Sequence, residues 1–209
     1  MSSIIDTAIQ CLRDESQALI DLIPTIGADF QHAVELILQC PGKVIVTGVG
    51  KSGHIGAKIA ATLSSTGTPS FFINPLDAFH GDLGVIGTED LVLAISNSGE
   101  TDELLRFFPY LLARQIPVIG MSGNEKSLLA QYSSVHLNIS VKKEACPMGL
   151  APTTSTTVTL ALGDALACAL IVARDFKASD FAQFHPGGAL GRRLLTCAKD
   201  VMHTDSLPT

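Results

Sequence analysis

The stretch VIVTGVGKSGHIG (residues 44–56) joins a run of β-branched residues to a glycine-rich turn. Gly48, Gly50 and Gly53 have the spacing G-x-G-x-x-G, which in α/β proteins links a strand to the helix that follows it. The pattern predicts a strand over 43–48 and a helix over 53–65. Because open α/β sheets bind ligands beyond the carboxyl ends of their strands, this stretch also predicts where a site lies.

Two nucleotide-binding interpretations of this stretch fail on particular residues. A Walker A loop requires a glycine where the chain has Ile45, and an acidic residue at the end of a nearby strand that instead ends in Ser96. A dinucleotide site requires an acidic residue after the second strand, where the chain has Asn74. Lys51, at the start of a helix, reinforces a dipole that favours anions. A small phosphate-bearing ligand therefore fits better than a nucleotide.

Short apolar runs alternate with helical spacing along the rest of the chain. Runs of five or six apolar residues are typical of parallel strands that are buried on both faces. We therefore predict a doubly wound α/β sandwich with a parallel sheet of five strands flanked by helices. The predicted strands are 43–48, 70–74, 90–96, 116–121 and 134–139. The predicted helices are two before residue 40, 53–65, 101–113, a short one before the last strand, 154–174 and one from about 187.

The composition excludes several classes of partner. The chain has 209 residues, a net charge of −6 and no basic block, which argues against a nucleic-acid surface. Only 16% of residues are charged, against about 25% in typical soluble domains, which favours some surface buried between subunits. Five cysteines without C-x-x-C spacing, and no signal peptide at the start, predict reduced thiols in the cytoplasm. The longest apolar run, 158–173, contains Asp164 and predicts a core helix, not a membrane span.

A second loop, SNSGET (96–101), follows the third predicted strand. Ser96, Ser98 and Thr101 place three hydroxyls before the first turn of a helix, and Gly99 permits the turn. One hydroxyl suffices for an ordinary helix cap, so three favour a cradle for a phosphoryl group. The two loops give the candidate substrate-binding residues Gly50, Ser52, Ser96, Asn97, Ser98 and Thr101. His80, in FHGDLG before the third predicted strand, is a further candidate.

Two glutamates and one histidine are candidates for acid–base chemistry. Glu103 lies one turn into the helix after SNSGET, where acidic residues are also common simply because they complement the helix dipole. Glu144 lies in KKEACPMGLAPTTS (142–155), a loop shaped by prolines and a glycine. His185 lies in another glycine-rich turn, FHPGGALG. No pair of histidines has the spacing of metal ligands, so we predict no metal site.

The motifs occur in the order found in the sugar isomerase (SIS) domain family. The stretches that carry the resemblance are GKSGHIGAKIAATLSSTGTPSFF, HGDLG, ISNSGE, KEACPMGLAPTTST, GDALA and FHPGGALGRRLL. Within that family the chain most resembles the arabinose 5-phosphate isomerases of Gram-negative bacteria. Such proteins continue into a pair of CBS domains, and residues 198–209 resemble the start of that region. The implied organisation is N-terminal helices over 1–40, packed on the domain or on a neighbouring subunit, and an SIS domain over 41–197.

The resemblance implies interconversion of D-ribulose 5-phosphate and D-arabinose 5-phosphate, which supplies 3-deoxy-D-manno-octulosonate (Kdo) for lipopolysaccharide or capsule. It assigns catalytic roles to Lys51, Glu103, Glu144 and His185, and phosphate binding to the SNSGET loop. It also implies a homotetramer with active sites near subunit contacts, where His185 reaches a neighbour's site.

The reaction moves a proton between C1 and C2 through a cis-enediol and needs no redox cofactor. Lys51 would stabilise the enediolate oxygen, and His185 would shuttle protons between oxygens or open the sugar ring. Either Glu103 or Glu144 could be the carbon base. We favour Glu103, because it directly follows the phosphate loop. The alternatives are a domain that senses a sugar phosphate without converting it, and an isomerase of another sugar phosphate.

Overall fold

The computed structural model describes residues 3–186, and its centre is one parallel sheet with strand order β2-β1-β3-β4-β5. Val44 of β1 pairs with Ser70 of β2 on one side and with Leu91 of β3 on the other. This order places the point where the winding reverses between β1 and β3, which is where doubly wound sheets bind ligands. The strands are β1 (Val44–Gly48), β2 (Ser70–Ile73), β3 (Leu91–Ile95), β4 (Val118–Ser122) and β5 (Val135–Asn138).

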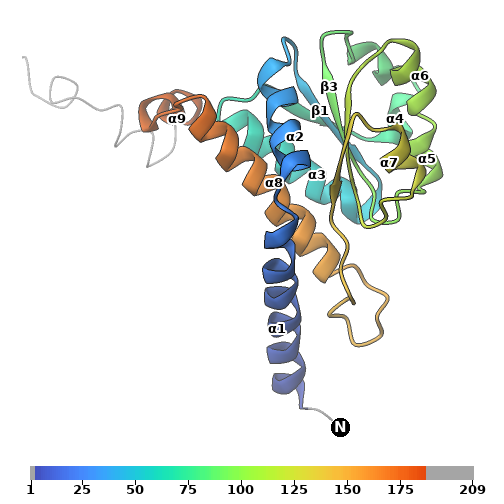
Figure 1. Cartoon of the computed structure of the whole chain (residues 1–209), viewed down its shortest axis with the longest axis vertical. Helices are drawn as coiled ribbons and strands as arrows, with labels where there is room; N and C mark the ends of the chain where they lie inside the picture. The colour runs from blue at the N-terminus through green and yellow to red at the C-terminus, as the bar shows by residue number, and fades with distance from the viewer. Residues whose placement is uncertain (1–2, 187–209) are drawn as a thin grey trace, which may run out of the picture.

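Alternate residues of the strands enter two separate cores, one on each face of the sheet. Val44 and Val46 of β1 face a core that includes Ile59 and Leu166, whereas Ile45 faces the core on the other side. The first core is covered by α1 (Ile4–Leu22), α2 (Ala28–Gln39), α3 (Gly50–Ser65) and α8 (Thr154–Ala173). The second is covered by α4 (Pro75–Ala78), α5 (Asp102–Leu105), α6 (Phe108–Ala113) and α7 (Leu128–Tyr132). The predicted doubly wound α/β sandwich is confirmed (Figure 1).

The N-terminal helices differ in how they pack. Ala33 and Ile37 of α2 are fully buried in the first core, whereas α1 has no buried residue. Figure 1 shows α1 extending away from the sheet, in contact with α8 along part of its length. Ile4 is 91% exposed and Leu12 is 66% exposed. A short 3-10 helix, η1 (Ile23–Thr25), separates the two N-terminal helices that the sequence predicted.

The helix predicted over 101–113 is interrupted in the structure. It divides into α5 and α6, and Pro109 lies in the first turn of α6. Proline has no N–H group to donate to the preceding turn, so the ladder of helical hydrogen bonds stops there and starts again.

Three further elements also differ from the prediction or were not predicted. Helix α3 begins at Gly50, earlier than predicted, and a second 3-10 helix, η2 (Asp82–Val85), precedes β3. An unpredicted helix, α9 (Ala178–Phe184), follows α8. The helix predicted from about 187, and the boundaries at 197 and 198–209, lie outside the described residues.

Helix α8 is long and apolar enough to cross a membrane by length and composition alone. In the structure it packs along α3 and also contacts α1 and α2. Val158, Leu162, Leu166 and Leu170 recur on its buried face. This packing agrees with the core helix that the interrupted apolar run predicted.

Candidate functional site

Helices α3 and α8 run side by side in the same direction. Near their middles, Lys58 Nζ lies 2.5 Å from Asp164 Oδ1. At Gly163, a Cβ atom would lie only 2.4 Å from Ile59 Cδ1, so the glycine permits the close approach of the two helices. The N-termini of both helices therefore lie at the same end, and their dipoles together favour an anion there.

A cavity of about 310 Å³ lies between these two N-termini and the loop after β3. It is therefore at the carboxyl edge of the sheet, beside the β1/β3 switch point. Within the part of the chain that the structure describes, Lys51 is the one residue with an ionisable side chain that lines this cavity. The lining residues are Val49, Lys51, Ser52, Ile55, Asn97, Ser98, Thr101, Pro152, Ser155, Thr156 and Thr159.

The glycine loop after β1 turns sharply into α3. Gly50 has φ +59°, a conformation that residues with a side chain rarely adopt. A Cβ atom at Gly53 would lie 2.6 Å from the Gly48 carbonyl oxygen, so this position requires glycine as well. The tight turn brings Lys51 and Ser52 to the cavity wall at the start of the helix. Gly50 itself does not line the cavity but sets this geometry.

The three hydroxyls of SNSGET do come together. Ser96 Oγ lies 2.8 Å from Thr101 Oγ1 and 3.5 Å from Ser98 Oγ, and it accepts a hydrogen bond from the Gly99 N–H at 3.0 Å. Ser98 and Thr101 line the cavity, whereas Ser96 is buried, so it organises the loop. Asn97 lines the cavity beside them. Hydroxyls, two helix N-termini and one cation form a site suited to a single phosphoryl group.

The first turns of α8 contribute a wall of the cavity that the sequence analysis did not identify. Ser155, Thr156 and Thr159 line the cavity, and the Thr159 hydroxyl donates to the Ser155 carbonyl at 2.8 Å. The run TTSTTVT (153–159), hydroxyl-rich and directly before an apolar helix, was the available signal. Its position in space depends on α8 packing along α3, which no local pattern reveals.

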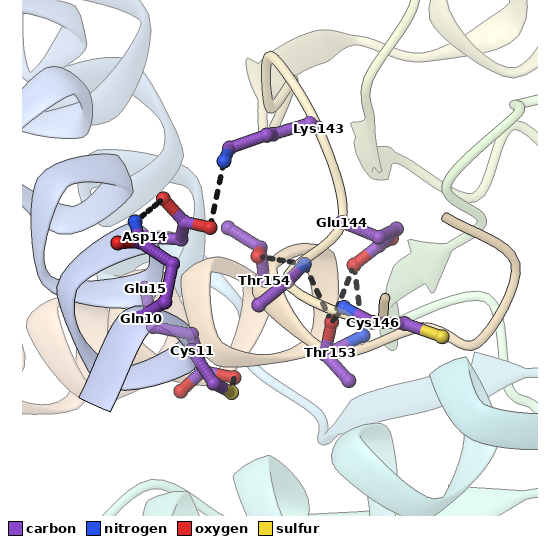
Figure 2. A network of polar contacts seen from close by, with 10 residues as sticks. Gln10, Cys11, Asp14, Glu15, Lys143, Glu144, Cys146, Thr153 and Thr154 are labelled. Atoms are coloured by element: carbon purple, nitrogen blue, oxygen red, sulfur yellow. Dashed lines mark hydrogen bonds and ion pairs between the residues drawn. The ribbon is translucent and has the colours of Figure 1, made fainter. Parts of the chain in front are cut away.

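Glu144 lies on the segment 142–153, which we call the strap, and it binds the start of α8 (Figure 2). Its Oε2 accepts hydrogen bonds from the Thr153 N–H at 2.8 Å, the Thr153 hydroxyl at 3.1 Å and the Ser155 N–H at 3.2 Å. Partial burial raises the pKa of this carboxyl, but the hydrogen bonds from Ser155 and Thr153 outweigh it, and the net pKa is below the usual value. Glu144 does not line the cavity.

The other side of the strap is attached to α1 (Figure 2). Lys143 Nζ lies 2.7 Å from Asp14 Oδ2, and Lys142 Nζ lies 2.7 Å from Asp21 Oδ2. Both lysine side chains are largely exposed to water, which screens the two ion pairs, so these pairs add little to the stability of the fold.

Glu103, His80 and His185 are not among the residues that line the cavity. Glu103 is half-buried on α5, and no hydrogen bond or ion pair joins its carboxylate to another described residue. His80 is exposed after α4. His185 follows α9, beyond the far end of α8, a helix of 20 residues that is about 30 Å long. Its ring stacks on Phe181 at 3.9 Å between centroids, and its Nδ1 lies 2.9 Å from the Phe181 carbonyl oxygen.

Among residues 3–186, no group of three or more His, Cys, Asp or Glu side chains is arranged to hold a metal ion. His136 lies on β5 with Nε2 2.8 Å from the Ser122 hydroxyl. The lining of the cavity thus provides a cation and hydroxyls that favour an anion. The described lining of one chain, however, contains no carboxylate or imidazole to serve as a base.

Comparison with known proteins places this chain in a family. The model of the SIS domain matches residues 37–169. The chain is 56% identical over 201 residues to the arabinose 5-phosphate isomerase KdsD of Yersinia pestis, covering 96% of this chain and 61% of that protein. It is 57% identical to KdsD of Pseudomonas aeruginosa, covering 93% of this chain and 60% of that one. The chain therefore spans about three-fifths of the length of these curated relatives.

Solved structures of similar proteins agree with this fold over most of the chain. The chain superposes with a TM-score of 0.85 on the protein c3406 of E. coli CFT073 in complex with arabinose 5-phosphate. The two sequences are 40% identical, and the match covers 89% of this chain and 100% of that one. It superposes equally well, at 0.85, on a phosphosugar isomerase from Bacteroides fragilis described as involved in capsule formation, at 36% identity, covering 89% of this chain and 99% of that one.

Proposed function

The chain belongs to the SIS domain family, and on that premise we propose that it is an aldose–ketose isomerase of D-ribulose 5-phosphate and D-arabinose 5-phosphate. The observation that carries the proposal is the cavity at the β1/β3 switch point, where Lys51 and two helix N-termini face the hydroxyls of SNSGET. The relatives named KdsD, and the similar structure that holds arabinose 5-phosphate, support this choice of substrate.

The phosphate would bind to the SNSGET loop. The hydroxyls of Ser98 and Thr101 face the cavity, and buried Ser96 fixes both of them. A phosphate held there sets the distance from the loop to C1 and C2 of the open-chain sugar. Positioning of this kind makes a large contribution to catalysis, because the reacting carbons then meet the catalytic groups without further loss of entropy.

Chemistry at C1 and C2 would proceed through a cis-enediol. A base removes the proton from C2 of the aldose or C1 of the ketose and returns it to the other carbon. Lys51, which lines the same cavity as the SNSGET loop, would stabilise the enediolate oxygen as negative charge develops. Glu103 and Glu144 are the candidates for the base, and His185 for proton transfer between oxygens and ring opening.

A second copy of the chain would complete the site. In one chain, Lys51 is the one ionisable residue of the described lining, and His185 lies beyond the far end of α8. The exposed apolar residues of α1, including Ile4, Ile5 and Leu12, offer a surface for association. We therefore propose a homotetramer in the cytoplasm with sites near subunit contacts, serving Kdo synthesis without a redox cofactor.

Isotope exchange tests the proposed activity. The protein is incubated with D-ribulose 5-phosphate in deuterated water, and the sugars are followed by NMR. We expect D-arabinose 5-phosphate to form, with deuterium incorporated at carbon. Binding without conversion or exchange would instead indicate a sensing domain, an alternative favoured by the scarcity of ionisable groups in the described lining. Faster turnover of another sugar phosphate would reassign the substrate.

A further inference from the structure

We propose that Glu144 is a positioning residue that caps α8 and holds its first turn as a wall of the cavity, while another group transfers the carbon proton. The proposal rests on the proposed isomerase function. It resolves a choice that sequence reasoning left open, since Glu103 and Glu144 were both compatible with the role of base. The two carboxylates make different contacts, and this difference distinguishes their roles.

The start of α8 lacks a side-chain cap of its own. Thr153, its N-cap residue, makes no capping hydrogen bond to the helix through its side chain. Glu144 supplies the missing acceptor, because a single oxygen, Oε2, receives the N–H groups of Thr153 and Ser155 together with the Thr153 hydroxyl. A negative charge at this position also complements the positive end of the dipole of α8.

The contacts in the other direction tie the strap to the same turn. Thr153 Oγ1 accepts the N–H groups of Ala145 at 3.0 Å and Cys146 at 3.2 Å, and Thr154 Oγ1 accepts that of Ala145 at 2.9 Å. A carboxylate of the strap therefore accepts hydrogen bonds from N–H groups at the start of the helix. In return, threonine hydroxyl oxygens at the start of the helix accept hydrogen bonds from N–H groups of the strap. Figure 2 shows these hydrogen bonds gathered around Thr153, and we call this group of hydrogen bonds between the strap and the start of α8 the knot.

This knot fixes part of the cavity wall. Pro152 and Ser155, one on each side of the contacts, both line the cavity. The Ser155 carbonyl in turn accepts the Thr159 hydroxyl at 2.8 Å, so the placement of the first turn extends to the next one. Loss of the Glu144 carboxylate would therefore displace the part of the cavity wall formed by Pro152 and Ser155, while leaving Lys51 and the SNSGET loop unchanged.

The same contacts make Glu144 a poor base. A base needs a lone pair directed at the carbon-bound proton, whereas three hydrogen bonds to Oε2 hold the Glu144 carboxylate against the start of α8. Its hydrogen bonds also hold the pKa of this carboxyl below the usual value, which weakens it as a proton acceptor. The Glu103 carboxylate, in contrast, has no hydrogen-bond or ion-pair partner among the described residues.

Two substitutions at one position distinguish positioning from proton transfer. Glu144→Gln keeps an oxygen that can accept all three hydrogen bonds, whereas Glu144→Ala removes it. We expect Glu144→Gln to retain kcat within about tenfold and Glu144→Ala to lose about 100-fold in kcat/KM with a clear rise in KM. Loss of a base would instead cost about 10²–10⁴-fold in both variants. The control is Glu125→Gln, an exposed carboxylate that accepts a hydrogen bond from the Asn138 side chain and has no hydrogen bond to the strap or to α8.

The result that would overturn the proposal is equal loss in both variants. If Glu144→Gln and Glu144→Ala each lose about 10³-fold in kcat and in deuterium exchange while still binding D-arabinose 5-phosphate, Glu144 is the base. Thermal unfolding of each variant shows whether it is folded. If Glu144→Ala does not fold, Thr153→Val, which removes a hydroxyl from the same knot, takes its place with the same expected rise in KM.

Failure of the proposed function gives a different pattern. In that case the unaltered chain neither converts the sugar nor exchanges deuterium, and the affinity for D-arabinose 5-phosphate, measured by calorimetry, becomes the readout. Positioning predicts that Glu144→Gln binds within a few-fold of the unaltered chain and that Glu144→Ala binds at least tenfold more weakly. Equal affinity of all three proteins would overturn the positioning role independently of catalysis.

Discussion

Two carboxylates at opposite ends of the sheet make the same kind of contact, with different consequences. Asp90, directly before β3, is 2% exposed and accepts the N–H groups of Lys43 and Gly87, each at 2.8 Å. Glu144, at the other end, accepts the N–H groups of Thr153 and Ser155. Each holds together segments distant in sequence, but only Glu144 holds a wall of the cavity. The function of such a contact depends on the end of the sheet at which it lies.

The amino end of the sheet is built for stability. Lys43 Nζ adds an ion pair to Asp90 at 3.3 Å, and a Cβ atom at Gly42 would lie 2.3 Å from Asp90 Oδ1. The carboxylate is therefore enclosed by backbone and leaves no room for a ligand. A strand of five residues, about 16 Å long, separates this end from the cavity. The carboxyl end instead exposes Lys51 and hydroxyls to a cavity.

The largest expected effect comes from the lysines at the two ends. Lys51→Met removes the cation that faces the enediolate, and we expect kcat/KM to fall about 10²–10³-fold with little change in the midpoint of thermal unfolding. Lys43→Met removes an ion pair whose lysine is 45% exposed, so we expect a loss of at most about 1 kcal/mol in stability and unchanged turnover. Steady-state kinetics and thermal melts of both variants measure this contrast. Loss of turnover in Lys43→Met would show that the two ends are not independent.

The second expected effect concerns stability alone. Asp90→Asn can satisfy only one of the two N–H groups, because its amide nitrogen is a donor, and it leaves Lys43 without its partner. We expect the free energy of unfolding in urea to fall by about 2–4 kcal/mol, with kcat per folded molecule unchanged. Glu89→Gln, at the exposed neighbouring position, is the control and should change stability by less than about 0.5 kcal/mol. A drop in kcat comparable to that of Lys51→Met would contradict the division of roles between the ends.

The fold at both ends could be predicted from the sequence, because apolar runs and glycine turns are local signals. The β1 strand, the turn at Gly50 and the three hydroxyls at Ser96, Ser98 and Thr101 all lie where the pattern places them. Even the break before α6 has a local cause in Pro109.

The partners of the carboxylates could not be predicted. Glu144 binds residues nine and eleven positions away across a loop shaped by prolines and a glycine, and Asp90 binds the Lys43 N–H 47 positions away. Contacts of this kind depend on the packing of α8 along α3 and on the pairing of β1 with β3, not on local spacing. For the same reason the sequence could not separate Glu103 from Glu144 by their contacts, and it did not reveal Thr156 and Thr159 in the cavity wall.

The smallest expected effect is the pH dependence of the amino end. Burial raises the pKa of Asp90, but the N–H groups of Gly87 and Lys43 and the Lys43 ammonium outweigh it, so the pKa is below its usual value in the folded chain. The unfolded state then binds more protons in acid, so the contribution of Asp90 is complete above the unfolded pKa of about 4 and is lost as the pH falls through the folded pKa. We expect the difference in unfolding free energy between the unaltered chain and Asp90→Asn to be constant from pH 7 to about 5 and to shrink below about 4. Urea titrations across this range measure it, and a difference that widened in acid would mean that Asp90 is not held as the carboxylate.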